Sequence, residues 1–121
     1  NNTVVTINRA AGCTVTLPAS SGSGQRYELF CGTTITSNAL VIHVANATDV
    51  MQGALAVTTD AAGVVIPTAA TSDTISMNGS TTGGVIGSRV VLQDVAAGYW
   101  AVSGALVSTG AESTPFSATV S

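Results

Sequence analysis

Charge is scarce in this sequence. Only 7% of the residues are charged, against roughly 25% in an average soluble domain, and lysine is absent. The three basic residues are Arg9, Arg26 and Arg89, scattered along a chain whose net charge is −3. Because proteins bind phosphate backbones with clusters of basic side chains, the composition excludes nucleic acid as a partner.

Long apolar runs and large aromatic side chains are also missing. The longest apolar runs, such as residues 39–42 and 64–66, are far shorter than the roughly 20 residues that span a bilayer, so no membrane partner is expected. The chain is 45% hydrophobic but only 4% aromatic, and most of its apolar residues are alanine and valine. A core of small side chains stabilises weakly. A weakly stabilised core and a surface with few charges together indicate a chain that binds copies of itself or a larger assembly.

The 121 residues suit one domain, and turn-forming residues divide them into segments of the length of β-strands. Breaks rich in glycine, asparagine and aspartate separate runs of valine, isoleucine and threonine that often alternate. The only helical turn expected is near residues 48–53. We predict a single all-β domain over residues 1–121, an antiparallel β-sandwich or jelly-roll-like barrel of about eight to ten short strands. Residues 1–8 are a candidate N-terminal arm.

The two cysteines fall in a predicted hairpin formed by residues 13–17 and 27–31, with residues 18–24 as its loop. Pairing residue 17 with 27, 15 with 29 and 13 with 31 puts the apolar side chains on one face. Cys13 would then lie opposite Cys31, at a separation within or at the edge of disulfide range. Two states stay open, a disulfide or two free buried thiols, and synthesis in a reducing cell favours the second. Two cysteines alone do not form a zinc site, so no metal or other cofactor is expected.

A second hairpin is predicted near the C-terminus. Val90 and Leu92 face the same way as Val102 and Trp100, with residues 94–98 as the turn and Gly98 suited to a positive φ. Trp100 is the expected anchor of the core. The alternation elsewhere predicts further inward side chains at Leu40, Ile42, Val44, Met51, Leu55, Val57, Ile75 and Met77.

No residue pattern indicates catalysis. His43, the only histidine, is expected on the face opposite its apolar neighbours, and the chain has no Gly-x-Ser-x-Gly elbow. We therefore expect a surface or interface side chain at this position and no enzymatic activity. The Ser-Gly run at 21–24 and the glycines at 83–87 lack the context of a phosphate loop and are expected to be turns. The acidic residues are isolated in the sequence: Glu28, Asp49, Asp60, Asp73, Asp94 and Glu112. The four aspartates among them lie in or beside predicted turns.

The segments that remain informative are strand and turn patterns. They include Val15-Thr16-Leu17-Pro18-Ala19, the segment 45–51, the segment 71–75, the segment Gly98-Tyr99-Trp100-Ala101-Val102-Ser103-Gly104 and the closing segment 114–120. Their order over most of the chain resembles the capsid decoration, or cement, proteins of tailed phages. The resemblance implies a β-sandwich-like fold without enzymatic activity, a homotrimer, and binding to the major capsid protein on the outer surface of a virion that is made in the bacterial cytoplasm.

Two other classes compete with this interpretation. One is a receptor- or glycan-binding domain of a phage tail fibre or adhesin, and the other, weaker one is a hydrolase built on a β-sandwich. If the chain assembles with copies of itself or with a capsid, the contacts should come from apolar residues left over once the inward faces are assigned. The candidates are Val41, Val64, Val65, Ile66, Val91, Tyr99 and Phe116.

Overall fold

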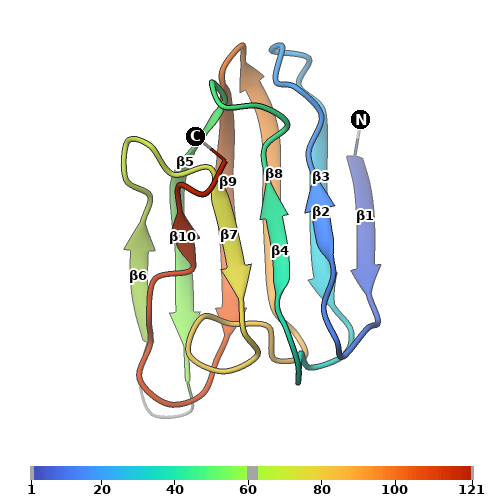
Figure 1. The fold of residues 1–121 in the computed structure, drawn as a ribbon, viewed down its shortest axis with the longest axis vertical. Helices are drawn as coiled ribbons and strands as arrows, with labels where there is room; N and C mark the ends of the chain where they lie inside the picture. Colours follow the sequence, from blue (N-terminus) through green and yellow to red (C-terminus); the bar gives the residue numbers. More distant parts are fainter. Residues whose placement is uncertain (1, 60–62, 121) are drawn as a thin grey trace.

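A computed structural model describes residues 2–59 and 63–120, and its ten strands form two facing sheets (Figure 1). The larger sheet has the order β1 (Asn2–Ile7), β3 (Arg26–Cys31), β8 (Arg89–Ala96), β9 (Tyr99–Val107), β5 (Val50–Thr58), β6 (Gly63–Pro67). The smaller sheet has the order β10 (Phe116–Ser117), β7 (Thr74–Met77), β4 (Leu40–His43), β2 (Thr14–Thr16). The predicted all-β sandwich is confirmed, and both sheets are open rather than closed into a barrel.

Both sheets are mixed, which the prediction of an antiparallel sandwich did not anticipate. The pairs β1–β3, β2–β4 and β5–β9 are parallel. The partners in such a pair need a long connection, because a short turn joins only antiparallel neighbours. The chain makes these connections by crossing from one sheet to the other.

The core lies between the sheets and follows the alternation of each strand. The inward side chains predicted from residue 40 onwards are all buried, and Ile42 and Leu55 are fully buried. In the N-terminal runs, Cys13, Val15 and Tyr27 are only half-buried against the core. Trp100 is also fully buried, and its ring lies 5.9 Å from that of Tyr27, centroid to centroid. The indole N–H of Trp100 is buried without a hydrogen-bond partner in the described part of the chain, so Trp100 stabilises the core by packing alone.

The C-terminal hairpin of β8 and β9 has the predicted inward face, but its turn is shorter than the predicted 94–98, because β8 continues to Ala96. Leu92 lies opposite Val102, and Val90 lies opposite Gly104 on the same inward face. A β-bulge follows Asp94, and Gly98 has a φ of 90° in the turn. The hairpin was predictable because both of its strands and its turn are contiguous in the sequence.

The prediction of an N-terminal hairpin was wrong. β2 pairs with β4 in the smaller sheet, whereas β3 pairs with β1 and β8 in the larger one. The loop at 18–24 therefore crosses between the sheets instead of joining paired strands. Residues 2–7 of the candidate N-terminal arm form β1 at the edge of the larger sheet, and part of the expected helical turn near 48–53 belongs to β5.

The smaller sheet covers only part of the larger one. β1 and β6 are the edge strands of the larger sheet, and Figure 1 shows β6 standing beyond β10. Val5 and Val64 consequently remain 37% and 44% exposed although their side chains point to the inner face. No helix among the described residues is long and apolar enough to cross a membrane.

Candidate functional site

His43 lies on the outer face of the smaller sheet, as its alternation predicted. Its Nε2 is 3.3 Å from the hydroxyl oxygen of Thr16, its register partner on β2, and its Nδ1 is 2.8 Å from the carbonyl oxygen of Val44. Because a carbonyl only accepts, Nδ1 carries the proton and the Thr16 hydroxyl donates to Nε2 in the neutral ring. A hydroxyl beside a histidine is also the arrangement of the nucleophile and base in a catalytic triad. Here, however, a backbone carbonyl stands where a triad has a carboxylate to orient the ring, and Thr16 is exposed.

The Ser-Gly run at 21–24 wraps a buried carboxylate, that of Asp94. The backbone N–H groups of Ser21 and Gly22 donate to it at 3.0 and 2.8 Å, and the hydroxyl of Ser23 donates at 2.8 Å. Burial opposes ionisation, but these hydrogen bonds outweigh it and lower the pKa of Asp94 from 3.8 to about 2. The loop is thus an anion-binding turn whose anion is supplied by the chain itself.

Two further carboxylates are buried and are also used by the backbone. Asp49 accepts the N–H of Ser20 at 2.9 Å, and Asp73 accepts the N–H of Val120 at 3.2 Å. Such carboxylates hold loops and the C-terminal segment in place instead of facing a substrate. Among residues 2–59 and 63–120, no group of three or more histidine, cysteine, aspartate or glutamate side chains is placed to hold a metal ion. Asp60 lies outside the described residues.

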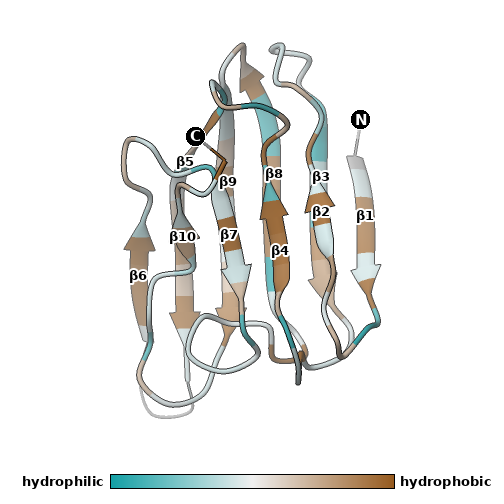
Figure 2. Ribbon diagram, viewed as in Figure 1, coloured by the Kyte–Doolittle hydropathy of each residue, from teal (hydrophilic) through white to brown (hydrophobic). Residues whose placement is uncertain are grey.

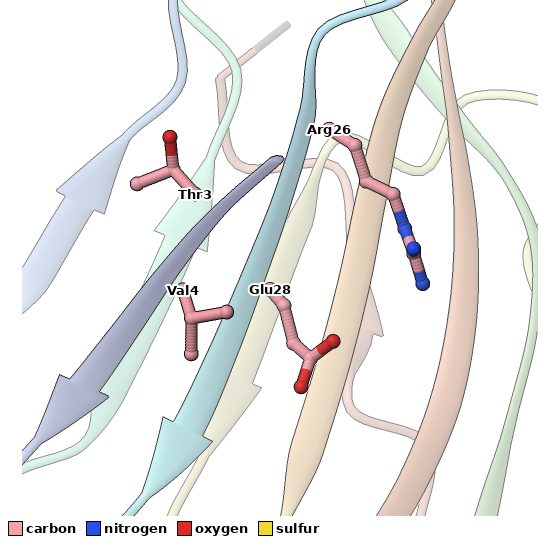
Figure 3. Close-up of a pocket in the computed structure, with 4 residues that line it drawn as sticks. All are labelled: Thr3, Val4, Arg26 and Glu28. Atoms are coloured by element: carbon pink, nitrogen blue, oxygen red, sulfur yellow. The ribbon is translucent and has the colours of Figure 1, made fainter. Parts of the chain in front are cut away.

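Three charged side chains, Arg26, Glu28 and Arg89, lie on the outer face of β3 and β8. Arg89 pairs with Glu28 at 3.0 Å and lies over the ring of Phe30, 5.8 Å from its centroid. Arg26 and Glu28 border a small hollow of about 50 Å³ together with Thr3 and Val4 of β1 (Figure 3). A hollow of this size has room for one or two water molecules rather than a substrate.

The two cysteines are free and lie on facing sheets. Cys31 ends β3 and is buried, whereas Cys13 precedes β2 and is half-buried against the same core. Burial raises the pKa of the Cys31 thiol, and the neighbouring Cys13 raises it further. The two residues therefore contact the same core from opposite sheets and do not oppose each other along a ladder, because β2 and β3 are not paired.

The seven candidate interface residues do not form one surface. Phe116 is buried within the core, and Val91 is buried on the outer face of the larger sheet, so neither exposes much of its side chain to a partner. Val41 and Tyr99 lie on different sheets. Only Val64, Val65 and Ile66 are contiguous, on β6, where Val65 is 65% exposed.

A groove that sequence reasoning missed opens between β1 and β2, on the side opposite β6. Its volume is about 260 Å³, and its lining is mostly apolar: Thr3, Val5, Val15, Thr16, Leu17, Pro18, Tyr27 and Leu29. The groove exists because the two sheets end at neighbouring edges without a strand between them. The alternation marked several of these residues as inward, but only the sheet order shows that nothing covers them.

The fold and these surfaces define an open two-sheet β-sandwich with mixed strand directions and an uncovered apolar side. No family model matches the chain, and no curated protein or solved structure matches it in the comparisons. The fold class therefore rests on the geometry of the chain itself.

Proposed function

We propose that the protein is a non-enzymatic structural component of a phage virion, which binds the outer surface of the capsid as a homotrimer and reinforces the shell. The observation that carries this proposal is the distribution of charge. Asp49, Asp73 and Asp94 are buried, and Glu28 is paired with Arg89. Much of the remaining surface is built from alanine, serine, threonine and valine.

An uncharged surface of this kind suits protein–protein contact. Desolvating an unpaired charge opposes association, and the outer faces of β5 and β9 carry none; their outward residues include Ala56, Ala101 and Ala105. Three linked copies would also bind a lattice of capsid subunits multivalently, so each contact with the capsid can be weak. The resemblance to decoration proteins supplies the capsid as the partner.

The test joins a mass measurement to a binding measurement. Multi-angle light scattering should give three chains per particle, and the protein should sediment with phage heads assembled without it. A monomer that ignores heads would refute the proposal. A trimer that ignores heads but adheres to host cells would instead favour a tail-fibre domain.

The absence of enzymatic activity is tested at His43, whose ring contacts the hydroxyl of Thr16. A generic ester such as p-nitrophenyl acetate should be hydrolysed at the same low rate by the natural protein and by His43→Ala. A hydrolytic rate that is well above that of free imidazole and disappears in both His43→Ala and Thr16→Val would establish an enzyme.

A further inference from the structure

The two edges of the larger sheet carry more than half of the exposed large hydrophobic side chains among the described residues. Among the described residues, four of the seven exposed large hydrophobic side chains lie on β1 or β6: Val4, Val5, Val64 and Val65, at 63%, 37%, 44% and 65%. Figure 2 shows hydrophobic residues along β6 and in the middle of β1. Neither strand contains a charged residue. Charges on an edge are a common means of preventing strands of different chains from pairing.

Each edge also presents unpaired peptide groups. In β1, the carbonyl of Ile7 accepts from Gly32, so alternate residues face β3 and the peptide groups of Val4 and Thr6 face outward. In β6, Thr68 donates to Gly53, and the same alternation leaves the N–H and C=O of Val65 facing away from β5.

The two edges run in opposite directions. Following the pairings across the sheet, β1 and β3 are parallel, β8 reverses, β9 and β5 share a direction, and β6 reverses again. Figure 1 shows β6 and β1 as arrows of opposite sense. If copies are related by rotation about an axis along the strands, β6 of one copy meets β1 of the next as an antiparallel pair.

We propose that β6 of one copy adds to the β1 edge of a second copy, with Val65 opposite Val4, and that three such joints close a ring. This register overlaps the full length of β6, and it puts Val65 beside Val4 on the outer face. On the inner face it puts Val64 beside Val5 and Ile66 beside Thr3. This inference deepens the proposed function, because it rests on a homotrimer and names the surface that forms it.

The groove between β1 and β2 matches this occupant. Thr3 and Val5 are part of its lining, so Val64 and Ile66 of the added strand would project over its apolar walls. Its volume of about 260 Å³ is slightly below the roughly 300–1,000 Å³ of pockets for small molecules, which favours a few aliphatic side chains as the occupant. Uncharged walls also meet an uncharged strand, so the joint desolvates no charge of either edge.

The area of one joint explains why the ring should close. Five paired residues and a few half-exposed valines offer well under the roughly 800 Å² per partner that a stable interface buries. A head-to-tail contact of this kind leaves a free edge at each end until rotation closes the ring. Closure into three adds a third joint without further loss of translational freedom, so monomers and trimers should dominate over dimers.

Engineered cysteines test the pairing directly. The Cα atoms of opposed residues in an antiparallel pair lie about 4.5–5.5 Å apart, which is within disulfide range. Under mild oxidation, a mixture of Val4→Cys and Val65→Cys should give covalent dimers, whereas each variant alone and the natural protein should not. The double variant Val4→Cys/Val65→Cys should give covalent species that end at three chains.

Each other outcome overturns the pairing in a recognisable way. Cross-linking of Val65→Cys alone would indicate a two-fold β6–β6 contact, and cross-linking of Val4→Cys alone a β1–β1 contact. Bands beyond three chains would indicate an open filament. A trimer that binds heads without the mixed cross-link would refute this interface but not the capsid role, and a cross-linked trimer that ignores heads would do the reverse.

A charge on the inner face of the same strand provides a second readout. Val64→Lys should raise the concentration of half-dissociation at least about tenfold, because the joint would place an unpaired charge over the apolar groove. Val95→Lys is the matched control, since Val95 is 53% exposed near the β8–β9 turn. Circular dichroism should show both variants folded. Equal dissociation in the two variants would contradict the proposal.

Discussion

The loop at 18–24 and the side between β1 and β2 differ in the hydrogen bonding of their peptide groups. In the loop, buried carboxylates accept the N–H groups of Ser20, Ser21 and Gly22. At the side, the outward peptide groups of β1 have no partner strand, and exposed valines stand beside them. The difference teaches that the chain buries three carboxylates where its own backbone needs acceptors, and keeps its edge strands neutral where another chain can pair.

Removing the acceptor in the loop should have the largest effect. Asp94→Ala leaves several N–H groups and hydroxyls without their partner, and we expect the free energy of unfolding to fall by about 3 kcal/mol. Urea denaturation measures the change. Glu112→Ala is the control, because Glu112 has no hydrogen bond or ion pair in the described part of the chain, and it should change stability by less than about 0.5 kcal/mol. Similar losses in both variants would show that the Asp94 network contributes little.

Acid should weaken the same loop more gradually. The pKa of Asp94 is lowered to about 2 in the folded chain, from 3.8 without these contacts. Its contribution is therefore fully present above the higher value, and it is lost as the pH falls from about 4 towards 2. Unfolding midpoints measured between pH 6 and pH 2 should show this decline. The decline should be shallower in Asp94→Asn, and an unchanged slope in that variant would assign the acid sensitivity to other groups.

The sequence predicted what alternation and contiguity determine. The inward faces of β4, β7, β8 and β9 are as expected, because period-two patterning states which side chains share a face. It does not state which strand is the neighbour. The runs at 13–17 and 27–31 alternate as a hairpin would, yet the connection between them, residues 18–26, crosses to the other sheet. Parallel pairs such as β5–β9 join residues about fifty positions apart and leave no local signal.

The buried carboxylates show the same limit. The sequence placed Asp94 in a predicted turn, whereas its carboxylate lies on β8 and accepts from a loop more than seventy positions away. One signal was present, because Asp94 continues the inward alternation of Val90 and Leu92. A carboxylate at an inward position requires donors, and the Ser-Gly run is rich in them. The groove had no comparable signal, since it follows from where the sheets end.

Substitutions at the floor of the groove, at Leu29, and at its rim, at Val5, should change the free energy of unfolding by different amounts. Leu29 lines the groove but is only 3% exposed, because it also belongs to the core. Leu29→Ala should lower the free energy of unfolding by about 2 kcal/mol or more. The measurement is urea denaturation at a protein concentration low enough to give monomers. A loss below about 0.5 kcal/mol would mean that the floor of the groove is not part of the folded core.

The smallest effect on stability is expected at the rim. Val5 is 37% exposed on edge strand β1, and threonine has nearly the same shape and a similar preference for strands. Val5→Thr should therefore change the free energy of unfolding of the monomer by less than about 0.5 kcal/mol. It should nevertheless weaken association of the copies, because its hydroxyl would face Val64 of the added strand inside an apolar groove.

Val95→Thr is the control, since it makes the same substitution at an exposed valine outside the groove. It should change neither the free energy of unfolding nor the association of the copies. Sedimentation velocity over a dilution series compares the two variants. If Val5→Thr associates as tightly as Val95→Thr, then the uncovered side of the sandwich is not where the copies meet.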